Sequence, residues 1–392
     1  MWRFLNRATW KVKGLIEIMK EIYLDNSATT KVCDASCEKA IYMMSTNYGN
    51  PSSLHSKGLD AENVLDEARD IIAKKISAEA KEIYFTSGGT EANNLAVIGT
   101  CRRLKSRGNK IVTTAIEHSS VMESAKEMEK EGFEVVYVAP GTDGKVSEQV
   151  LADAIDERTI LVSVMMVNNE TGARQPVESV KKIIKEKKSP ALFHVDAVQA
   201  FCKTDVNVKK IQCDLMSITA HKVHGPKGIG ALFVSKNAKI KPILFGGEQQ
   251  KKIRPGTEST PLIAAFAAAV SMSSAHDTIE DLRKYCLQKI TSIPDIMLNS
   301  PVDSIGVLNF SVLGIKSETL LHFLSKKNIF VSSSSACARG KKSYVLKSMG
   351  LEDGLIDSAI RVSFSRYNTT EDIDILIDKI QSAQAQLVKI KK

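Results

Sequence analysis

One lysine stands between two short apolar segments, in a setting that suits covalent chemistry by an amine. Lys222 follows an apolar run at 214–218 and precedes a turn interrupted by glycine and proline, with a second apolar run at 229–234. The pattern predicts a buried strand, a turn and another strand. Burial at a strand end lowers a lysine's pKa, and the neutral amine can form a Schiff base with an aldehyde. Thr219 and His221 would then face the phosphate of an aldehyde cofactor.

The alternative for Lys222 is an ordinary surface lysine beside a turn, and its immediate neighbours do not decide between the two. Polar residues at the ends of other predicted strands favour the reactive lysine. His118, Asn169 and Asp196 with Gln199 each follow a predicted strand, as Lys222 does. Open parallel sheets bind their ligands beyond the carboxyl ends of the strands. We therefore expect these side chains to share one site.

Strands and helices alternate along most of the chain, which predicts a mostly parallel sheet covered by helices on both faces. The expected strands are 83–86, 111–115, 134–138, 160–164, 191–195, 214–218 and 229–234, and the expected helices are 59–76, 119–131, 148–156 and 177–185. After a long apolar helix that starts at Pro261, the pattern changes to a second region. There we expect strands at 307–311, 330–332 and 359–364, and helices at 317–326, 344–349 and from 370.

A glycine-rich turn joins the strand at 83–86 to the next helix through Gly88, Gly89 and Thr90. Glycines at such a turn let backbone N–H groups converge on an anion, and the helix dipole adds to the attraction. The spacing fits neither the dinucleotide motif nor the P-loop, so a single small phosphate is the expected ligand. By itself the turn is weak evidence, because many helices begin after paired glycines.

The composition describes an ordinary globular chain of 392 residues, 43% hydrophobic and 25% charged. The longest apolar run, 262–270, is too short to span a bilayer, so no membrane partner is expected. The seven cysteines include no CxxC pair, which argues against a disulfide framework or a zinc site and predicts a reducing, cytoplasmic location without a metal.

The net charge of the whole chain is +9. Residues 1–18 contain four basic residues and one acidic residue, so the rest of the chain carries +6. No basic stripe with interleaved aromatic residues accompanies this charge, so no stable nucleic-acid binding is expected. Residues 1–18 are expected to lie outside the fold. They weakly resemble an organellar transit segment, but we favour a true start at Met19, which leads directly into a predicted strand at 22–24.

A series of motifs along nearly the whole chain from about residue 21 resembles the NifS-like class of cysteine desulfurases. That class belongs to the fold-type-I pyridoxal-phosphate (PLP) enzymes of the class V aminotransferase superfamily. The matching segments are 24–26, 49–53, 87–91, 117–118, 168–172, 194–197, 221–222, 225–228, Arg254, 256–257 and 335–337. The resemblance implies the fold-type-I architecture, with a large domain at 33–261 and a smaller α+β domain at 262–392. Residues 19–32 are expected to pack with the small domain.

The resemblance also implies an activity. The enzyme would be an obligate homodimer that binds PLP, converts L-cysteine to L-alanine and holds the sulfur as a persulfide on its own cysteine. A sulfur-acceptor protein, either an iron–sulfur scaffold or a tRNA thiolase, would then receive the sulfur. The sequence does not say which acceptor is served.

The implied roles fall on individual residues. Lys222 would carry the Schiff base and move the substrate proton, Cys337 would be the nucleophile, and His118 would stack on the cofactor ring as an acid or base. The remaining implied cofactor ligands are Gly89, Thr90, Asn169, Asp196, Gln199, Thr219 and His221, with Thr257 arriving from the partner subunit. Arg361 and Asn50 would bind the substrate.

Two departures from the family pattern and two alternatives remain. The family usually has glycine where this chain has Ser334 and serine where it has Pro255; neither change removes a functional group. The first alternative is another PLP enzyme of similar fold, an aminotransferase or a lyase, and the serine-rich stretch around Cys337 argues against it. The second alternative, a scaffold that only binds sulfur-transfer partners, is disfavoured because every polar group the chemistry needs is present.

Overall fold

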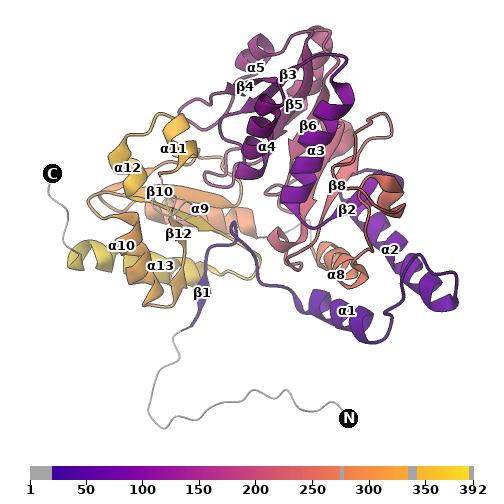
Figure 1. The fold of residues 1–392 in the computed structure, drawn as a ribbon. Coiled ribbons are helices and arrows are strands. Elements are labelled where there is room, and N and C mark those ends of the chain that lie inside the picture. Colours follow the sequence, from indigo (N-terminus) through magenta and orange to yellow (C-terminus); the bar gives the residue numbers. More distant parts are fainter. Residues whose placement is uncertain (1–19, 274–277, 334–341, 388–392) are drawn as a thin grey trace, which may run out of the picture.

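Seven strands form the large sheet on which most of the chain is built (Figure 1). The structure is a computed structural model and describes residues 20–273, 278–333 and 342–387. In spatial order the strands are β2 (Ile83–Thr86), β8 (Gly230–Val234), β7 (Leu215–Thr219), β6 (Leu192–Asp196), β5 (Thr159–Met165), β3 (Lys110–Thr114) and β4 (Glu134–Val138). Within this sheet β8 runs antiparallel to both of its neighbours, and the other paired strands run parallel. The mostly parallel seven-stranded sheet predicted from the sequence is confirmed.

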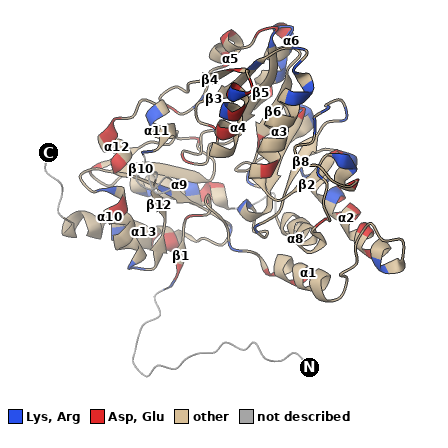
Figure 2. Ribbon diagram, in the orientation of Figure 1, with Lys and Arg blue, Asp and Glu red and all other residues tan. Residues whose placement is uncertain are grey.

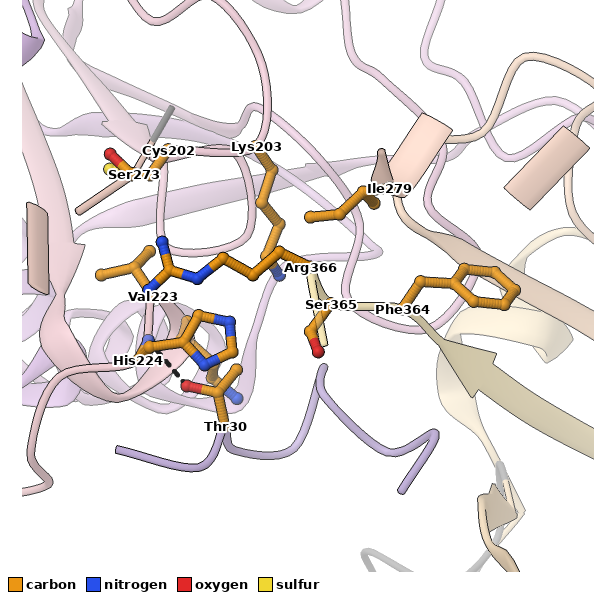
Figure 3. Close-up of a pocket in the computed structure, with 11 residues that line it drawn as sticks. Thr30, Cys202, Lys203, Val223, His224, Ser273, Ile279, Phe364, Ser365 and Arg366 are labelled. Carbon is orange, nitrogen blue, oxygen red and sulfur yellow. Dashed lines mark hydrogen bonds between the residues drawn. The ribbon is translucent and has the colours of Figure 1, made fainter. Parts of the chain in front are cut away.

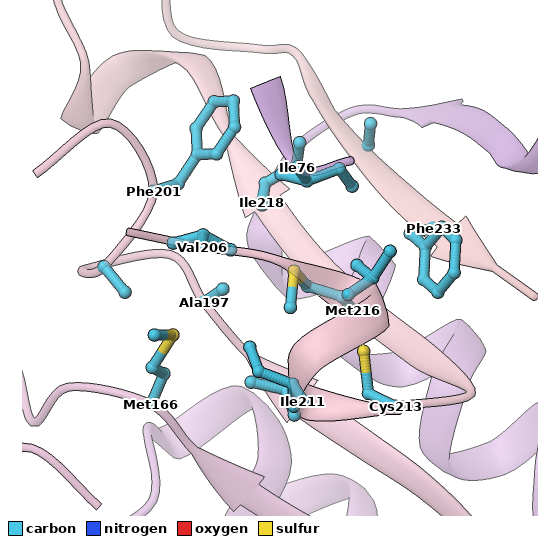
Figure 4. Packing of buried hydrophobic residues seen from close by; sticks show 14 of the residues in the cluster. Ile76, Met166, Ala197, Phe201, Val206, Ile211, Cys213, Met216, Ile218 and Phe233 are labelled. Carbon is cyan, nitrogen blue, oxygen red and sulfur yellow. The ribbon is translucent and has the colours of Figure 1, made fainter. Parts of the chain in front are cut away.

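Helices cover both faces of this sheet, and the sequence of β5 shows why. All seven residues of β5 are buried, as expected of a central strand covered on both sides. The helices of this region are α1 (Asp34–Ser45), α2 (Ser56–Lys75), α3 (Gly89–Leu104), α4 (Ser119–Lys130), α5 (Glu148–Ala154), α6 (Val177–Glu186), α7 (Val208–Ile211) and α8 (Thr260–Ser271), with short 3₁₀ turns η1 (Ala80–Glu82), η2 (Ala220–Lys222) and η3 (Gln249–Lys252). Apolar residues of α2, α6 and α8 pack on one face, where Met216 and Phe233 of the sheet lie among them (Figure 4). Residues of α3 and α4 pack on the other face.

Charged residues lie mainly on the outer surfaces of these helices. Figure 2 shows basic and acidic residues interspersed over the helices, whereas α8 is drawn without either. The sequence of α8 contains no charged residue, and most of it is buried against α1 and α2. In the described ranges, no helix is long and apolar enough to cross a membrane.

A second, smaller sheet has its own hydrophobic core. It has the order β12 (Ser332–Ser333), β13 (Ala359–Ser363), β10 (Val307–Val312) and β9 (Ile296–Leu298), and all its pairs are antiparallel. The helices around it are α9 (Ile279–Ile290), α10 (Ser317–Ser325), α11 (Tyr344–Ser348), α12 (Asp353–Asp357) and α13 (Thr370–Gln386). The N-terminal strand β1 (Ile22–Tyr23) pairs in parallel with β11 (Ile329–Phe330), and Ile22 and Leu24 enter this second core. The first described residues therefore lie beside the C-terminal half, before the chain enters the large sheet.

The structure differs from the sequence prediction at several elements. The single strand expected at 330–332 is wrong: the chain changes partners at Val331, so that β11 pairs with β1 and β12 pairs with β13. The sequence prediction has no counterpart for the helices α1, α7, α9 and α12 or for the strand β9. The exposed face of α1 carries Ile41, Tyr42 and Met44, so α1 lacks the separate apolar and polar faces by which surface helices are recognised.

The turn that precedes α3 lies directly against strand β8, because the backbones of Gly88 and Gly230 approach each other closely. Gly88 has φ 156° and ψ −178°, a conformation that is essentially restricted to glycine. A Cβ on Gly230 of β8 would lie 2.9 Å from the Cα of Gly88 and 2.7 Å from the carbonyl oxygen of Ile218. Glycine at 230 is therefore required for this turn to rest on the sheet.

We predict that Gly230→Ala lowers the free energy of unfolding by about 1–3 kcal/mol, because the methyl group meets backbone atoms that have little room to move. Gly354→Ala is the matched control, since a Cβ there has no described atom within 4 Å. Thermal unfolding of both variants checks this. Equal melting temperatures for the two variants would show that the approach at Gly230 is not a constraint.

Candidate functional site

A cavity of about 390 Å³ opens at the carboxyl ends of the parallel strands. Its volume lies in the range of small-molecule and cofactor sites. The residues that line it include Ser27, Ala28, Gly89, Thr90, Asn93, His118, Ser120, Asn169, Asp196, Val198, Gln199, Thr219, His221, Lys222 and Arg361. The structure thus brings together nine of the cofactor ligands expected from the sequence, from Gly89 to Lys222, and adds Arg361 from the small sheet.

Lys222 ends the 3₁₀ turn η2, directly after strand β7. Its Nζ donates hydrogen bonds to the carbonyl oxygen of Ser27 and, at 2.7 Å, to that of Ala28. Burial is the main cause that lowers the pKa of Lys222 to about 7, and the positive charges of Lys203 and Arg361 add to this effect. A large fraction of this amine is therefore neutral at neutral pH and can act as a nucleophile.

Asp196 ends strand β6 and is buried. Its Oδ2 accepts a hydrogen bond from Nδ2 of Asn93 at 2.7 Å, and its Oδ1 accepts one from the backbone N–H of Val198 at 3.0 Å. These donors hold the carboxylate in one orientation at the wall of the cavity. A carboxylate fixed in this way can bind a protonated ring nitrogen.

His118 caps the start of α4 and receives its orientation from the same network. Its Nδ1 accepts from the backbone N–H of Ser120 at 3.1 Å and lies 2.8 Å from the Ser120 hydroxyl, which in turn accepts from Nδ2 of Asn93 at 2.8 Å. Because Nδ1 is an acceptor, we assign the ring proton to Nε2, the nitrogen left free to face the cavity. Loss of hydration lowers the pKa of His118, so the ring enters as a neutral imidazole.

The N-terminus of the 16-residue helix α3 forms the anion-binding end of the cavity. Gly89 and Thr90 stand in its first turn, and a Cβ on Gly89 would lie 2.9 Å from Cγ2 of Val198. Thr219 and His221 approach from the sheet, where Thr219 Oγ1 donates to the carbonyl oxygen of Ile229 at 3.1 Å. Backbone N–H groups and hydroxyls are the donors that hold a phosphate.

Arg361 of β13 connects the small sheet to this cavity. Its Nη2 forms an ion pair with Asp25 at 2.9 Å, and its Nη1 donates to the carbonyl oxygen of Asn169 at 3.0 Å. The buried Nε of Arg361 and Oδ1 of Asn169 have no hydrogen-bond partner among the described residues. A guanidinium has five N–H groups, so Arg361 keeps unused donors for a carboxylate.

These features fit the PLP expected from the sequence. The cavity offers an amine of lowered pKa, a fixed carboxylate, a helix N-terminus with hydroxyls, and the Gln199 amide. It also contains polar atoms that lack a partner in the described chain, Oδ1 of Asn93 and of Asn169. Unsatisfied buried polar atoms are costly unless a ligand completes them.

Three of the expected site residues are not part of this lining. Cys337 lies outside the described residues. Asn50 is exposed, and its Oδ1 accepts from the backbone N–H of Ser52 at 2.9 Å within its own turn. Thr257 is also exposed, in the segment that follows Arg254. The roles of all three stay predictions.

Four residues that the sequence did not single out help to build the site: Ser27, Asn93, Ser120 and Lys203. Asn93 carried one available signal, because it is a polar residue on the buried face of α3 beside Ala92 and Leu95. Ser27 lies in a polar turn at 25–30, for which the sequence left open a pocket border or a simple strand end, and its contacts with the large sheet involve residues more than 170 positions away.

Comparison with known proteins gives a family match. The aminotransferase class-V family model matches residues 22–376. A cysteine desulfurase IscS of Clostridium botulinum is 39% identical over 371 residues, which cover 92% of this chain and 93% of that protein. A putative cysteine desulfurase IscS 1 of Bacillus subtilis is 41% identical over 369 residues, which cover 91% and 96%.

Solved structures agree with the sequence relatives. One described as a NifS-like protein superposes with a TM-score of 0.89 at 35% identity, covering 94% of this chain and all of that one. A second, SspA in complex with cysteine, gives a TM-score of 0.80 at 32% identity and covers 89% of this chain and all of that one.

A buried carboxyl group beside His118 predicts a pH dependence of stability. Burial, with the nearby charge of Asp196, raises the pKa of Glu117 to about 8. Its Oε1 accepts from Thr114 Oγ1 at 2.9 Å and from the N–H of Met165 at 2.7 Å. The folded chain therefore holds a proton on Glu117 that the unfolded chain releases near pH 4.5. The proton's contribution to the free energy of unfolding is fully present below pH 4.5 and is lost as the pH rises through about 8.

We predict that the melting temperature of the wild type falls relative to that of Glu117→Gln between about pH 5 and pH 8. Above about pH 8 the difference between the two melting temperatures should stay constant. The glutamine keeps the shape and stays neutral at every pH. Melting curves of both proteins from pH 5 to 9 measure this difference. A difference that does not change with pH would mean that Glu117 is not protonated in the folded state.

Proposed function

The chain belongs to the aminotransferase class-V family and, within it, to the cysteine desulfurases, and from this premise we propose that it converts L-cysteine to L-alanine and passes the sulfur to Cys337. The observation that carries the proposal is that Lys222, Asp196 and Arg361 line one cavity, with the pKa of Lys222 lowered to about 7. Members of this family depend on PLP. When bound, PLP supplies an electron sink for bonds at the substrate's α-carbon.

Each residue has a task in this proposal. The neutral amine of Lys222 holds the cofactor and, once released by substrate, moves the proton at the α-carbon. Asp196 would pair with a protonated ring nitrogen of the cofactor, and the neutral imidazole of His118 would lie against the cofactor ring and serve as an acid or base. The free donors of Arg361 bind the substrate carboxylate, at roughly 1.5–3 kcal/mol for a charge-assisted hydrogen bond.

The described residues on either side of Cys337 support its role. Before it, β12 pairs with β13, so that Ser332 lies opposite Arg361. After it, the Ser343 hydroxyl donates to Glu170 at 2.5 Å, and the Tyr344 hydroxyl donates to the carbonyl oxygen of Glu117. Both flanks are therefore anchored at the rim of the cavity.

The sulfur transfer itself balances without an added oxidant. The thiolate of Cys337 attacks the sulfur of the bound cysteine, so an S–S bond forms and the C–S bond breaks. The carbon keeps the electron pair and takes up a proton, which leaves alanine. The persulfide then passes to an acceptor protein, and we propose iron–sulfur cluster assembly or tRNA thiolation in the cytoplasm as the pathway served.

We also propose a homodimer with composite sites. Thr257 is exposed and away from the cavity of its own chain, so a second chain is needed for it to reach a phosphate. Large apolar side chains are exposed on and after α1, among them Ile41, Met44 and Leu54. An exposed apolar surface of this kind marks a protein–protein contact.

Replacing Cys337 by serine separates the two halves of the reaction. Cys337→Ser should bind PLP and change its visible spectrum when L-cysteine is added, because neither step needs the thiol. It should form almost no alanine, and mass spectrometry should find no added sulfur. The exposed thiol Cys37 supplies the control, since Cys37→Ser should keep full alanine formation. Desulfuration by Cys337→Ser at the wild-type rate would favour a lyase that releases sulfide without a protein thiol.

The homodimer is tested by light scattering. The wild type should have twice the mass of one chain, and Ile41→Asp combined with Met44→Asp should weaken the dimer and reduce PLP retention. Val302→Asp is the control, because Val302 is equally exposed, 70% against 64% for Ile41, on the small-domain side. A fully active monomeric wild type would refute the composite site.

A further inference from the structure

A second lysine lies close to the reacting amine and has no role in the chemistry proposed above. Lys203 stands in the turn after β6, four residues beyond Gln199, and its backbone N–H donates to the carbonyl oxygen of Ala200 at 3.0 Å. Its Nζ donates to Oε1 of Gln199 at 3.0 Å. Lys203 is only partly exposed, and a lysine ammonium group is seldom placed inside a protein without a partner, so its contact with Gln199 needs an explanation.

A small cavity of about 20 Å³, with room for about one water molecule, lies beside the Lys203 side chain. Lys203 and Lys222 both line it, together with His224 and Arg366, and Figure 3 shows the Lys203 side chain running into it. The two lysines therefore border the same small cavity. Partly buried charges are screened less than charges at a surface.

Hydrogen bonds join the two lysines through Gln199 and Ser27. Oε1 of Gln199 accepts from Lys203 at 3.0 Å and from the Ser27 hydroxyl at 3.2 Å. Nε2 of Gln199 donates to the Ser27 carbonyl oxygen at 3.0 Å, and Lys222 donates to that same oxygen. The two amines are thus the ends of one connected network.

Lys203 leaves the Gln199 amide only one orientation. An ammonium group has donors and no acceptor, so a flipped amide would point its own N–H groups at Lys203. With the oxygen held toward Lys203, one N–H of Gln199 bonds to Ser27. The other is free to donate into the main cavity, which Gln199 lines.

We propose that Lys203 is a positioning residue for the reacting amine: its ammonium group orients the Gln199 amide and places a second positive charge beside Lys222. The proposal rests on the proposed function only in taking Lys222 as the reacting lysine.

The charge balance around Lys222 gives the direction of the effect. Lys203 and Arg361 oppose its protonation, whereas Asp25 and Asp196 favour it. His118 and His221 also face this region, and each has a lowered pKa and so adds little charge at neutral pH. Burial and Arg361 lower the pKa of Lys203 itself to about 8, so Lys203 is mostly charged at pH 7.

The experiment measures proton binding at Lys222 directly, in cofactor-free protein without cysteine. A small amount of isotopically labelled acetic anhydride modifies neutral amines, and mass spectrometry of the Lys222 peptide gives the labelling rate from pH 5 to 10. In the wild type the midpoint should lie near 7. In Lys203→Met it should move up by about one unit, which lowers the rate at pH 7 roughly fivefold.

Two further variants separate positioning from mere structural support. Lys203→Arg keeps the charge and should keep the wild-type midpoint. Lys210→Met removes an exposed lysine that is paired with Asp205 in the same region, and it should change nothing. Equal midpoints in wild type and Lys203→Met would overturn the proposal. So would an equal shift in Lys203→Arg, because the effect would then not come from the charge.

A second neutral variant covers the case in which Lys203→Met does not fold. Lys203→Gln also removes the positive charge, so it should raise the labelling midpoint of Lys222 as Lys203→Met does. An unchanged Lys222 midpoint in Lys203→Gln would contradict the proposal. Because no measurement here uses L-cysteine or PLP, a failure of the desulfurase assignment would leave these results unaffected.

Discussion

The removal of one amine from water, close to other positive charges, is the constraint on which this structure depends. An exposed lysine is protonated at neutral pH and is a poor nucleophile. Lys222 escapes this because it is buried at the end of β7 and faces Lys203 and Arg361. The carbonyl oxygens of Ser27 and Ala28 accept its hydrogen bonds without supplying a compensating negative charge.

That environment requires both cores of the protein to be in place. The large sheet contributes Lys222 and Asp196, the small sheet contributes Arg361, and the N-terminal segment supplies Ser27 and the Asp25 partner of Arg361. The N-terminal strand pairs with β11, so this segment is held by the second core while its next residues close the cavity of the first. The site therefore forms only when the two halves pack together.

The sequence predicted the large sheet well because each parallel strand is a short apolar run bounded by a turn. It also predicted the polar residues at the strand ends, since His118, Asp196 and Lys222 each follow such a run within four residues. It could not predict contacts made across the chain. The ion pair between Arg361 and Asp25 joins residues 336 positions apart, and the local sequence around either residue does not predict it. Lys203 was missed for the same reason, because its enclosure depends on packing between the turn after β6 and the small domain.

The central claim is that Lys222 is the amine that binds the cofactor, and chemical trapping tests it most directly. Borohydride reduction of the purified, PLP-loaded protein fixes the cofactor to the amine that holds it, and peptide mapping by mass spectrometry then locates it. The account predicts a modified peptide that contains Lys222 and none that contains Lys203, with no modification in Lys222→Ala. Cofactor fixed to Lys203 or to another lysine, or bound cofactor that cannot be fixed at all, would contradict it.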